Sequence, residues 1–138
     1  MNQLKNFIAK LNSLDITDDY LVSELYDLIE PIEDHPELKS ITQDIFIFIE
    51  NSPEADLGSP GPLVHLLETI DNCREMLHES IKRKPVSLTV WMLNRWLNLQ
   101  VEQREKELTL LKSVLGHSKA DEETKERAQG YLERHKDA

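Results

Sequence analysis

The sequence is poor in residues that build turns and disulfides. Its 138 residues include four glycines, six prolines and one cysteine. So few glycines and prolines leave little turn material for a fold of many strands. One cysteine excludes a disulfide within the chain, so an oxidising compartment is not required. No apolar run approaches the roughly 20 residues that span a bilayer, and the first residues lack the apolar stretch of a signal peptide. We therefore expect a cytoplasmic protein.

Basic residues are scarce in the first half of the chain. Residues 1–70 carry 14 carboxylates and three basic side chains, a net charge of −11, whereas residues 71–138 carry 12 and 13, a net charge of +1. Such a surface repels nucleic acid and anionic membranes, so we expect neither as a direct partner, and it attracts a basic protein. The alternative is that the acidity only maintains solubility, which does not require the charge to gather in one half.

Apolar side chains recur at helical spacing along most of the chain. Leu4, Phe7, Ile8, Leu11 and Leu14, for example, form a single stripe. The pattern predicts about seven helices, at residues 3–14, 18–30, 35–50, 60–82, 87–99, 102–115 and 120–135. Residues 45–49 have the composition of a strand, but the neighbouring Leu38 and Ile41 keep the helical period, so we favour a helix there.

The same pattern predicts an all-α fold in a single domain over residues 1–138, with an acidic half at 1–58 and a mixed-charge half at 59–138. Ser59 is the expected N-cap of the helix at 60–82. Short connections between helices are typical of an orthogonal bundle or of a short superhelix of helix pairs, as in HEAT and armadillo repeats.

Motifs for catalysis and ligand binding are scarce. There is no glycine-rich phosphate loop, and Gly58-Ser59-Pro60-Gly61 is not a nucleophile elbow. His65 and Glu68 have the spacing of two metal ligands on a helix, but a second such pair is missing. Cys73 occupies an apolar helical position, which is typical of a buried side chain. We expect no enzyme activity, no metal, no cofactor and no small-molecule ligand.

Two acidic segments are candidate partner-binding surfaces. The first is a ridge on the helix at 18–30, where carboxylates three or four residues apart repel each other and a cationic partner would relieve the repulsion. The second is the segment 54–62 of the loop at 51–62. The alternatives are a solvated helix face and a loop that only connects two helices. The candidate binding residues are Asp19, Tyr20, Glu24, Asp27, Glu30 and Asp34 on and around the ridge, and Glu54 and Asp56 in the loop.

Several segments resemble small all-helical immunity proteins of bacterial polymorphic-toxin systems, including contact-dependent growth inhibition. They are Asp56-Leu57-Gly58-Ser59-Pro60-Gly61-Pro62-Leu63-Val64-His65, Arg83-Lys84-Pro85, Thr89-Val90-Trp91-Met92-Leu93-Asn94-Arg95, Leu110-Leu111-Lys112 and residues 128–132. The resemblance covers residues 56–132. It implies a cytoplasmic protein that binds and blocks the toxin domain of a neighbouring gene, often a nuclease. It assigns no contact residues.

Charge and resemblance together lead to one main hypothesis. The protein is expected to bind a basic toxin domain, with a nuclease as the first candidate, and to neutralise it by covering its positive surface. The second hypothesis is a helical-repeat adaptor or regulator whose partner is not a toxin. A third, an enzyme that uses His65 with Glu68, would require a pocket around that pair.

Overall fold

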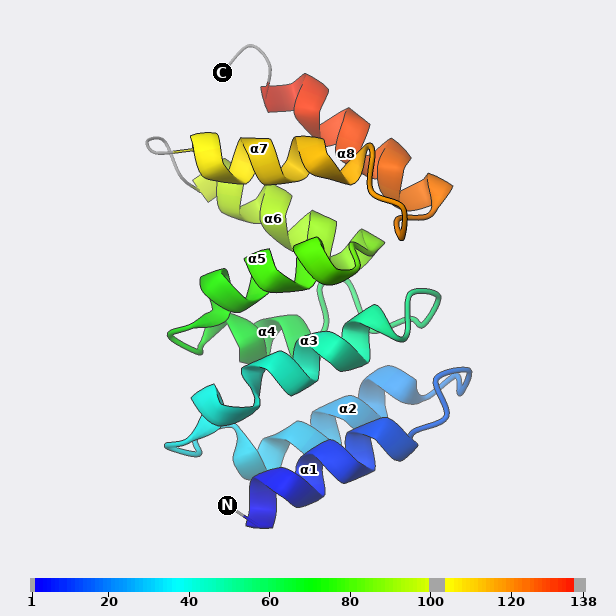
Figure 1. The fold of residues 1–138 in the computed structure, drawn as a ribbon. Helices are drawn as coiled ribbons and strands as arrows, with labels where there is room; N and C mark the ends of the chain where they lie inside the picture. The colour runs from blue at the N-terminus through cyan, green and yellow to red at the C-terminus, as the bar shows by residue number, and fades with distance from the viewer. Residues whose placement is uncertain (1, 100–103, 136–138) are drawn as a thin grey trace. The chain divides into compact units, whose positions relative to one another are not determined.

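The computed structural model describes residues 2–99 and 104–135, in which helices are joined by turns and loops (Figure 1). These residues form eight α-helices, two short 3-10 helices and no strand. The all-α prediction is therefore confirmed. Contacts within the chain define two compact units, residues 1–76 and residues 77–138. The prediction of a single domain stays a prediction.

Unit 1 begins with two antiparallel helices, α1 and α2, which pack against each other. Its elements are α1 (Asn2–Ser13), α2 (Leu21–Ile29), the 3-10 helices η1 (Glu30–Ile32) and η2 (Leu38–Ile41), α3 (Thr42–Glu50) and α4 (Pro62–Glu68). α1 also contacts α3, and α2 also contacts α4. Three of the five residues of the predicted stripe, Leu4, Phe7 and Leu11, are buried, whereas Ile8 and Leu14 are only half-buried and Leu14 lies beyond the end of α1. A bond from Gln3 Nε2 to the Pro31 carbonyl oxygen, 3.1 Å long, joins α1 to η1.

Unit 2 is built on three mutually packed helices, α6 (Ser87–Leu99), α7 (Glu105–Val114) and α8 (Glu122–His135). The helix before them, α5 (Cys73–Arg83), begins in unit 1 and continues into unit 2. Asp121 caps α8, because its Oδ1 accepts the Thr124 backbone N–H at 2.8 Å. α8 is mostly polar and buries little beyond Thr124, Ala128 and Tyr131, so it covers the edge of the unit.

The predicted helix at 35–50 is correct only in its second part. The strand-like residues 45–49 lie inside α3, so the strand alternative is wrong. The α-helix begins at Thr42 and is preceded by the 3-10 helix η2. Before η2, the Glu37 N–H donates to Nδ1 of His35 at 3.0 Å, and a residue that precedes a proline, such as His35, avoids the α conformation.

The single helix predicted at 60–82 is wrong, because the chain forms two helices there, α4 and α5. For this reason the described residues hold eight helices instead of about seven. The Thr69 hydroxyl donates to the Leu66 carbonyl oxygen at 2.7 Å and competes with the helical ladder. Asn72 Oδ1 then accepts the Thr42 hydroxyl at 2.8 Å, which anchors the break to α3. Helix periodicity continues through such a break, so the pattern did not reveal it.

The loop before α4 depends on two glycines. Gly58 and Gly61 have φ angles of +103° and +94°, which residues with a side chain rarely adopt. A Cβ atom at Gly61 would lie 1.8 Å from the Leu57 carbonyl oxygen. Gly61 is also the N-cap position of α4, with Pro62 as the first helical residue, so the prediction that Ser59 is the N-cap is wrong.

Substitution of Gly61 tests the loop. We expect Gly61→Ala to lower the free energy of unfolding by about 3 kcal/mol, from the strained φ and the clash with Leu57. The matched control is Gly130→Ala on α8, where a Cβ meets nothing within 4 Å. This control should raise the stability by about 0.5–1 kcal/mol. Urea denaturation followed by circular dichroism measures both, and equal effects at the two positions would contradict the assignment.

Candidate functional site: the acidic face of unit 1

The burial of α2 determines which side chains face the solvent. Leu21, Leu25 and Ile29 are buried against the rest of unit 1. The predicted ridge lies on the opposite side, where Asp27 and Glu30 are exposed. We use the name acidic face for the outward residues around α2, which are Asp19, Tyr20, Glu24, Asp27, Glu30 and Asp34. Glu24 is half-buried and the other five are exposed.

Two neighbouring carboxylates have structural roles in the turn before α2. Asp15 Oδ1 accepts the backbone N–H of Thr17 at 3.0 Å and its hydroxyl at 2.6 Å, and these bonds lower the pKa of Asp15 below its ordinary value. Asp18 Oδ1 accepts the Tyr20 N–H at 2.8 Å. These two carboxylates therefore shape the entry into α2.

The remaining carboxylates of the acidic face are free to meet a partner. Asp19, Asp27, Glu30 and Asp34 have no side-chain hydrogen bond or ion pair with any residue that the structure describes. Asp27 borders a shallow groove of about 240 Å³ between α1 and α2, which Lys10 also lines. Removal of these carboxylates would therefore cost no described bond within unit 1.

The pKa of Glu24 reflects the close spacing of negative charges on this face. A hydrogen bond with the Asp18 carboxyl, together with partial burial and the charges of Asp18 and Asp15, raises the pKa of Glu24 above its ordinary value of 4.5. A raised pKa means that the folded protein resists the ionised form. A cation that approached this cluster would reverse that effect.

Two tyrosines accompany the carboxylates. Tyr20 is 73% exposed and Tyr26 is 51% exposed, and both are large side chains with apolar rings and polar tips. Tyr20 is among the binding residues predicted from the sequence, and Tyr26 is not. The signal was present, because Tyr26 lies next to Leu25 and Asp27 and off the apolar stripe of α2. Exposed tyrosine is typical of contact surfaces between proteins.

The loop candidates occupy a different segment of unit 1. Glu54 and Asp56 are exposed in the loop between α3 and α4, which projects at the same end of the unit as the α1–α2 turn, whereas η1 lies at the other end (Figure 1). Asp56 Oδ1 accepts the Gly58 N–H at 3.1 Å and so supports the loop. Tyr20, Glu24, Asp27 and Glu30 thus run from the N-cap of α2 into η1, whereas Glu54 and Asp56 lie in a different segment of the unit.

Unit 2 contains buried polar contacts that the sequence analysis missed. His78 and Glu107 are both buried, with Nε2 and Oε2 3.1 Å apart. His135 Nε2 lies 2.7 Å from Asn94 Oδ1, and its Nδ1 contacts the Arg104 guanidinium. Burial and the charges of Arg104 and Arg134 lower the pKa of His135. Arg104 can only donate, so the ring is neutral with its proton on Nε2.

The residues considered for metal binding and catalysis do not assemble into a site. The described part of the chain has no group of three or more His, Cys, Asp and Glu side chains that could hold a metal ion. His65 and Glu68 are exposed on α4. Cys73 is buried, as predicted, and burial followed by the charge of Glu68 raises the pKa of its thiol to about 12. No described helix has both the length and the apolar character to cross a membrane.

The burial of Cys73 predicts an inert thiol. With a pKa of about 12, only about one thiol in ten thousand is ionised at pH 8, and the thiolate is the reactive form. We expect a disulfide reagent such as DTNB to react slowly with the folded protein at pH 8. In urea the reaction should reach one thiol per chain at the rate of a free cysteine. Rapid reaction of the folded protein would contradict the buried placement.

The raised pKa of Glu24 predicts a stabilising substitution. A carboxyl with a raised pKa stabilises the fold below pH 4.5, and this contribution is lost as the pH rises through the folded value. Glu24→Gln should therefore raise the unfolding midpoint at pH 7, and salt should reduce the gain. Glu33→Gln, at an exposed carboxylate just beyond η1, is the control and should change the midpoint less. Equal midpoints for wild type and Glu24→Gln would contradict the described crowding.

Comparison with known proteins does not assign this chain to a family. No protein-family model matches it, and comparisons with curated proteins and with solved structures find no match either. The immunity-protein resemblance therefore stays a prediction from the sequence. The molecule's own indications of function are the acidic face and the difference in net charge between the two units.

Proposed function

We propose that this protein binds a cationic surface of another protein through the acidic face of unit 1. The partner is a basic toxin domain, and a nuclease is the favoured candidate. The protein neutralises this domain by covering its positive charge. One observation carries the proposal. The residues of unit 1 have a net charge of −12, those of unit 2 have +2, and the exposed carboxylates of the acidic face make no described bond.

The charge of the acidic face suits fast recognition. A surface of one sign raises the rate at which an oppositely charged protein arrives, and the effect falls with salt. Tyr20 and Tyr26 supply the apolar contact area that charge alone lacks. Glu24 adds a specific gain, because a cation at this site would favour the ionised form that the folded protein alone resists.

A nuclease is the preferred partner because of its own chemistry. It must carry lysine and arginine side chains to hold the phosphate backbone. An acidic protein that occupies those side chains excludes the nucleic acid and needs no catalytic residue of its own. Both arrangements expected from the sequence, an orthogonal bundle and a short superhelix, are compatible with this role, because α2 needs only its inner side for packing.

Charge reversal tests the acidic face directly. The variant Asp27→Lys/Glu30→Lys changes two exposed side chains without a described bond, so the fold should persist. We expect capture of the partner, from cells that carry the native locus, to be lost or to elute at much lower salt. For the isolated partner, the association rate at low ionic strength should fall by about tenfold or more.

The matched control reverses the same number of charges in unit 2. Glu122→Lys/Glu126→Lys changes two exposed residues of α8 and should elute like the wild type. The proposal expects the captured protein to be a basic C-terminal fragment of a large secreted protein. Recovery of cytoplasmic housekeeping proteins instead would favour the adaptor hypothesis. Equal elution of all three baits would contradict a role for the acidic face.

A further inference from the structure

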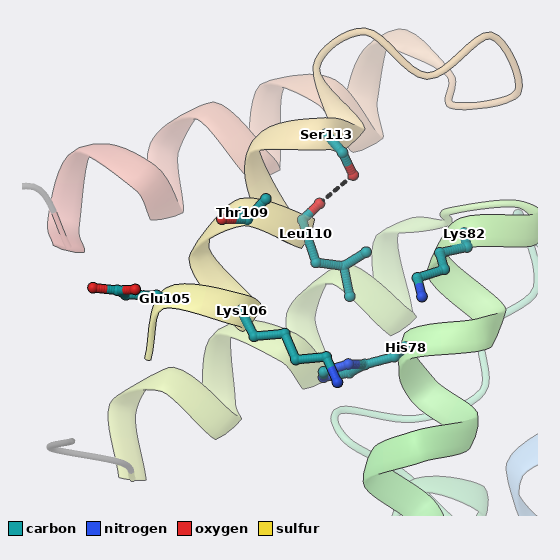
Figure 2. A pocket seen from close by; sticks show the side chains of 7 residues that line it. All are labelled: His78, Lys82, Glu105, Lys106, Thr109, Leu110 and Ser113. Carbon is teal, nitrogen blue, oxygen red and sulfur yellow. Dashed lines mark hydrogen bonds between the residues drawn. The ribbon is translucent and has the colours of Figure 1, made fainter. Parts of the chain in front are cut away.

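Unit 2 has a pocket that the proposed function does not use. It lies between α5 and α7, has a volume of about 630 Å³, and is lined from both helices (Figure 2). Its lining includes His78 and Lys82 from α5 and Lys106, Thr109 and Leu110 from α7. This volume falls in the range of small-molecule sites, about 300–1,000 Å³.

Two cations face this pocket in a protein that is otherwise acidic. The side chains of Lys82 and Lys106 extend from α5 and α7 toward the space between the helices (Figure 2). Glu105 also lines the pocket, and its carboxylate extends to the side of α7 away from Lys82 (Figure 2). Neither ammonium group has a hydrogen bond or ion pair with a residue that the structure describes. The two lysines are therefore available to an anion from two sides.

The neighbouring carboxylate of Glu107 does not neutralise the positive charge of Lys82 and Lys106. His78 is buried, and its Nε2 lies 3.1 Å from Oε2 of the buried Glu107. The Glu107 carboxylate is buried behind His78 and is not part of the pocket lining. The remaining lining is suited to an apolar group, since Leu110, the Thr109 methyl and the lysine stems all contribute carbon atoms.

The walls of the pocket are held in place by local bonds. The Lys119 N–H donates to Nδ1 of His117, so the proton of that ring is on Nε2. His117 Nε2 then donates to the Lys82 carbonyl oxygen at 2.9 Å, which fixes the end of α5 to the turn after α7. The Ser113 hydroxyl donates to the Leu110 carbonyl oxygen within α7. Because the walls of the pocket are already ordered, ligand binding loses less conformational entropy.

We propose that this pocket binds a small organic phosphate. The phosphate group lies between Lys82 and Lys106, and the organic part lies against Leu110 and Thr109. Two lysine ammonium groups are a common phosphate clamp, because each donates charge-assisted hydrogen bonds. The ligand class is new relative to the sequence analysis, which predicted no small-molecule ligand. The proposal is independent of the acidic face, which belongs to unit 1.

Nuclear magnetic resonance titration of the full-length, ¹⁵N-labelled protein tests the pocket. The probes are phenyl phosphate, inorganic phosphate and phenol, each up to about 10 mM, a range that detects millimolar affinities. We expect phenyl phosphate to shift amide signals of residues 77–83 and 105–114 and to bind more tightly than inorganic phosphate. Phenol should bind more weakly still, because it lacks the charge that the lysines recognise.

The variant Lys82→Ala/Lys106→Ala should weaken phenyl phosphate binding by at least about tenfold, because it removes both charge-assisted contacts. The control Lys112→Ala/Lys119→Ala removes the same charge from exposed positions outside the pocket lining and should bind like the wild type. A preserved amide spectrum shows that each variant is folded. The proposal is overturned if phenyl phosphate causes no shifts, if both variants bind equally well, or if phenol binds as tightly as phenyl phosphate.

Discussion

The position of the acidic face is determined by one constraint: α2 has a single apolar side to bury. Leu21, Leu25 and Ile29 take that side into the core of unit 1, where α2 packs against α1 and α4. Because an α-helix has 3.6 residues per turn, the carboxylates between these positions lie on the side of α2 that faces the solvent. Negative charge therefore gathers on the outer side of α2 as a consequence of the same packing that stabilises the helix. Binding of a cationic partner requires no rearrangement of this core.

Much of the fold was predictable because it follows from local periodicity. Leu4, Phe7 and Leu11 of the expected stripe are buried, and α2 ends at Ile29, two residues before Pro31, as expected. The split between α4 and α5 was not predictable in the same way. The Asn72 side chain anchors this break to α3 through Thr42, which is 30 residues away in the sequence. A pattern of apolar residues contains no information about such a long-range hydrogen bond.

The candidate sites also differ in whether local sequence patterns could predict them. The exposure of Asp27 and Glu30 followed from the helical wheel, whereas the structural use of Asp15, Asp18 and Asp56 depends on turn geometry that only the coordinates reveal. The pocket between α5 and α7 could not be predicted from the sequence, because Lys82 and Lys106 are 24 positions apart and line one pocket only when the two helices pack. The two units thus offer opposite chemistry: unbonded carboxylates around α2, and two lysines that face a pocket in unit 2.

The central claim is that a partner covers the acidic face, and hydrogen–deuterium exchange of the complex tests it most directly. The protein would be compared alone and bound to the protein that it captures from its native locus. The account predicts slower exchange in α2 and η1, residues 21–32, with unchanged exchange in α7 and α8. Protection confined to α7 and α8, with α2 unaffected, would contradict it.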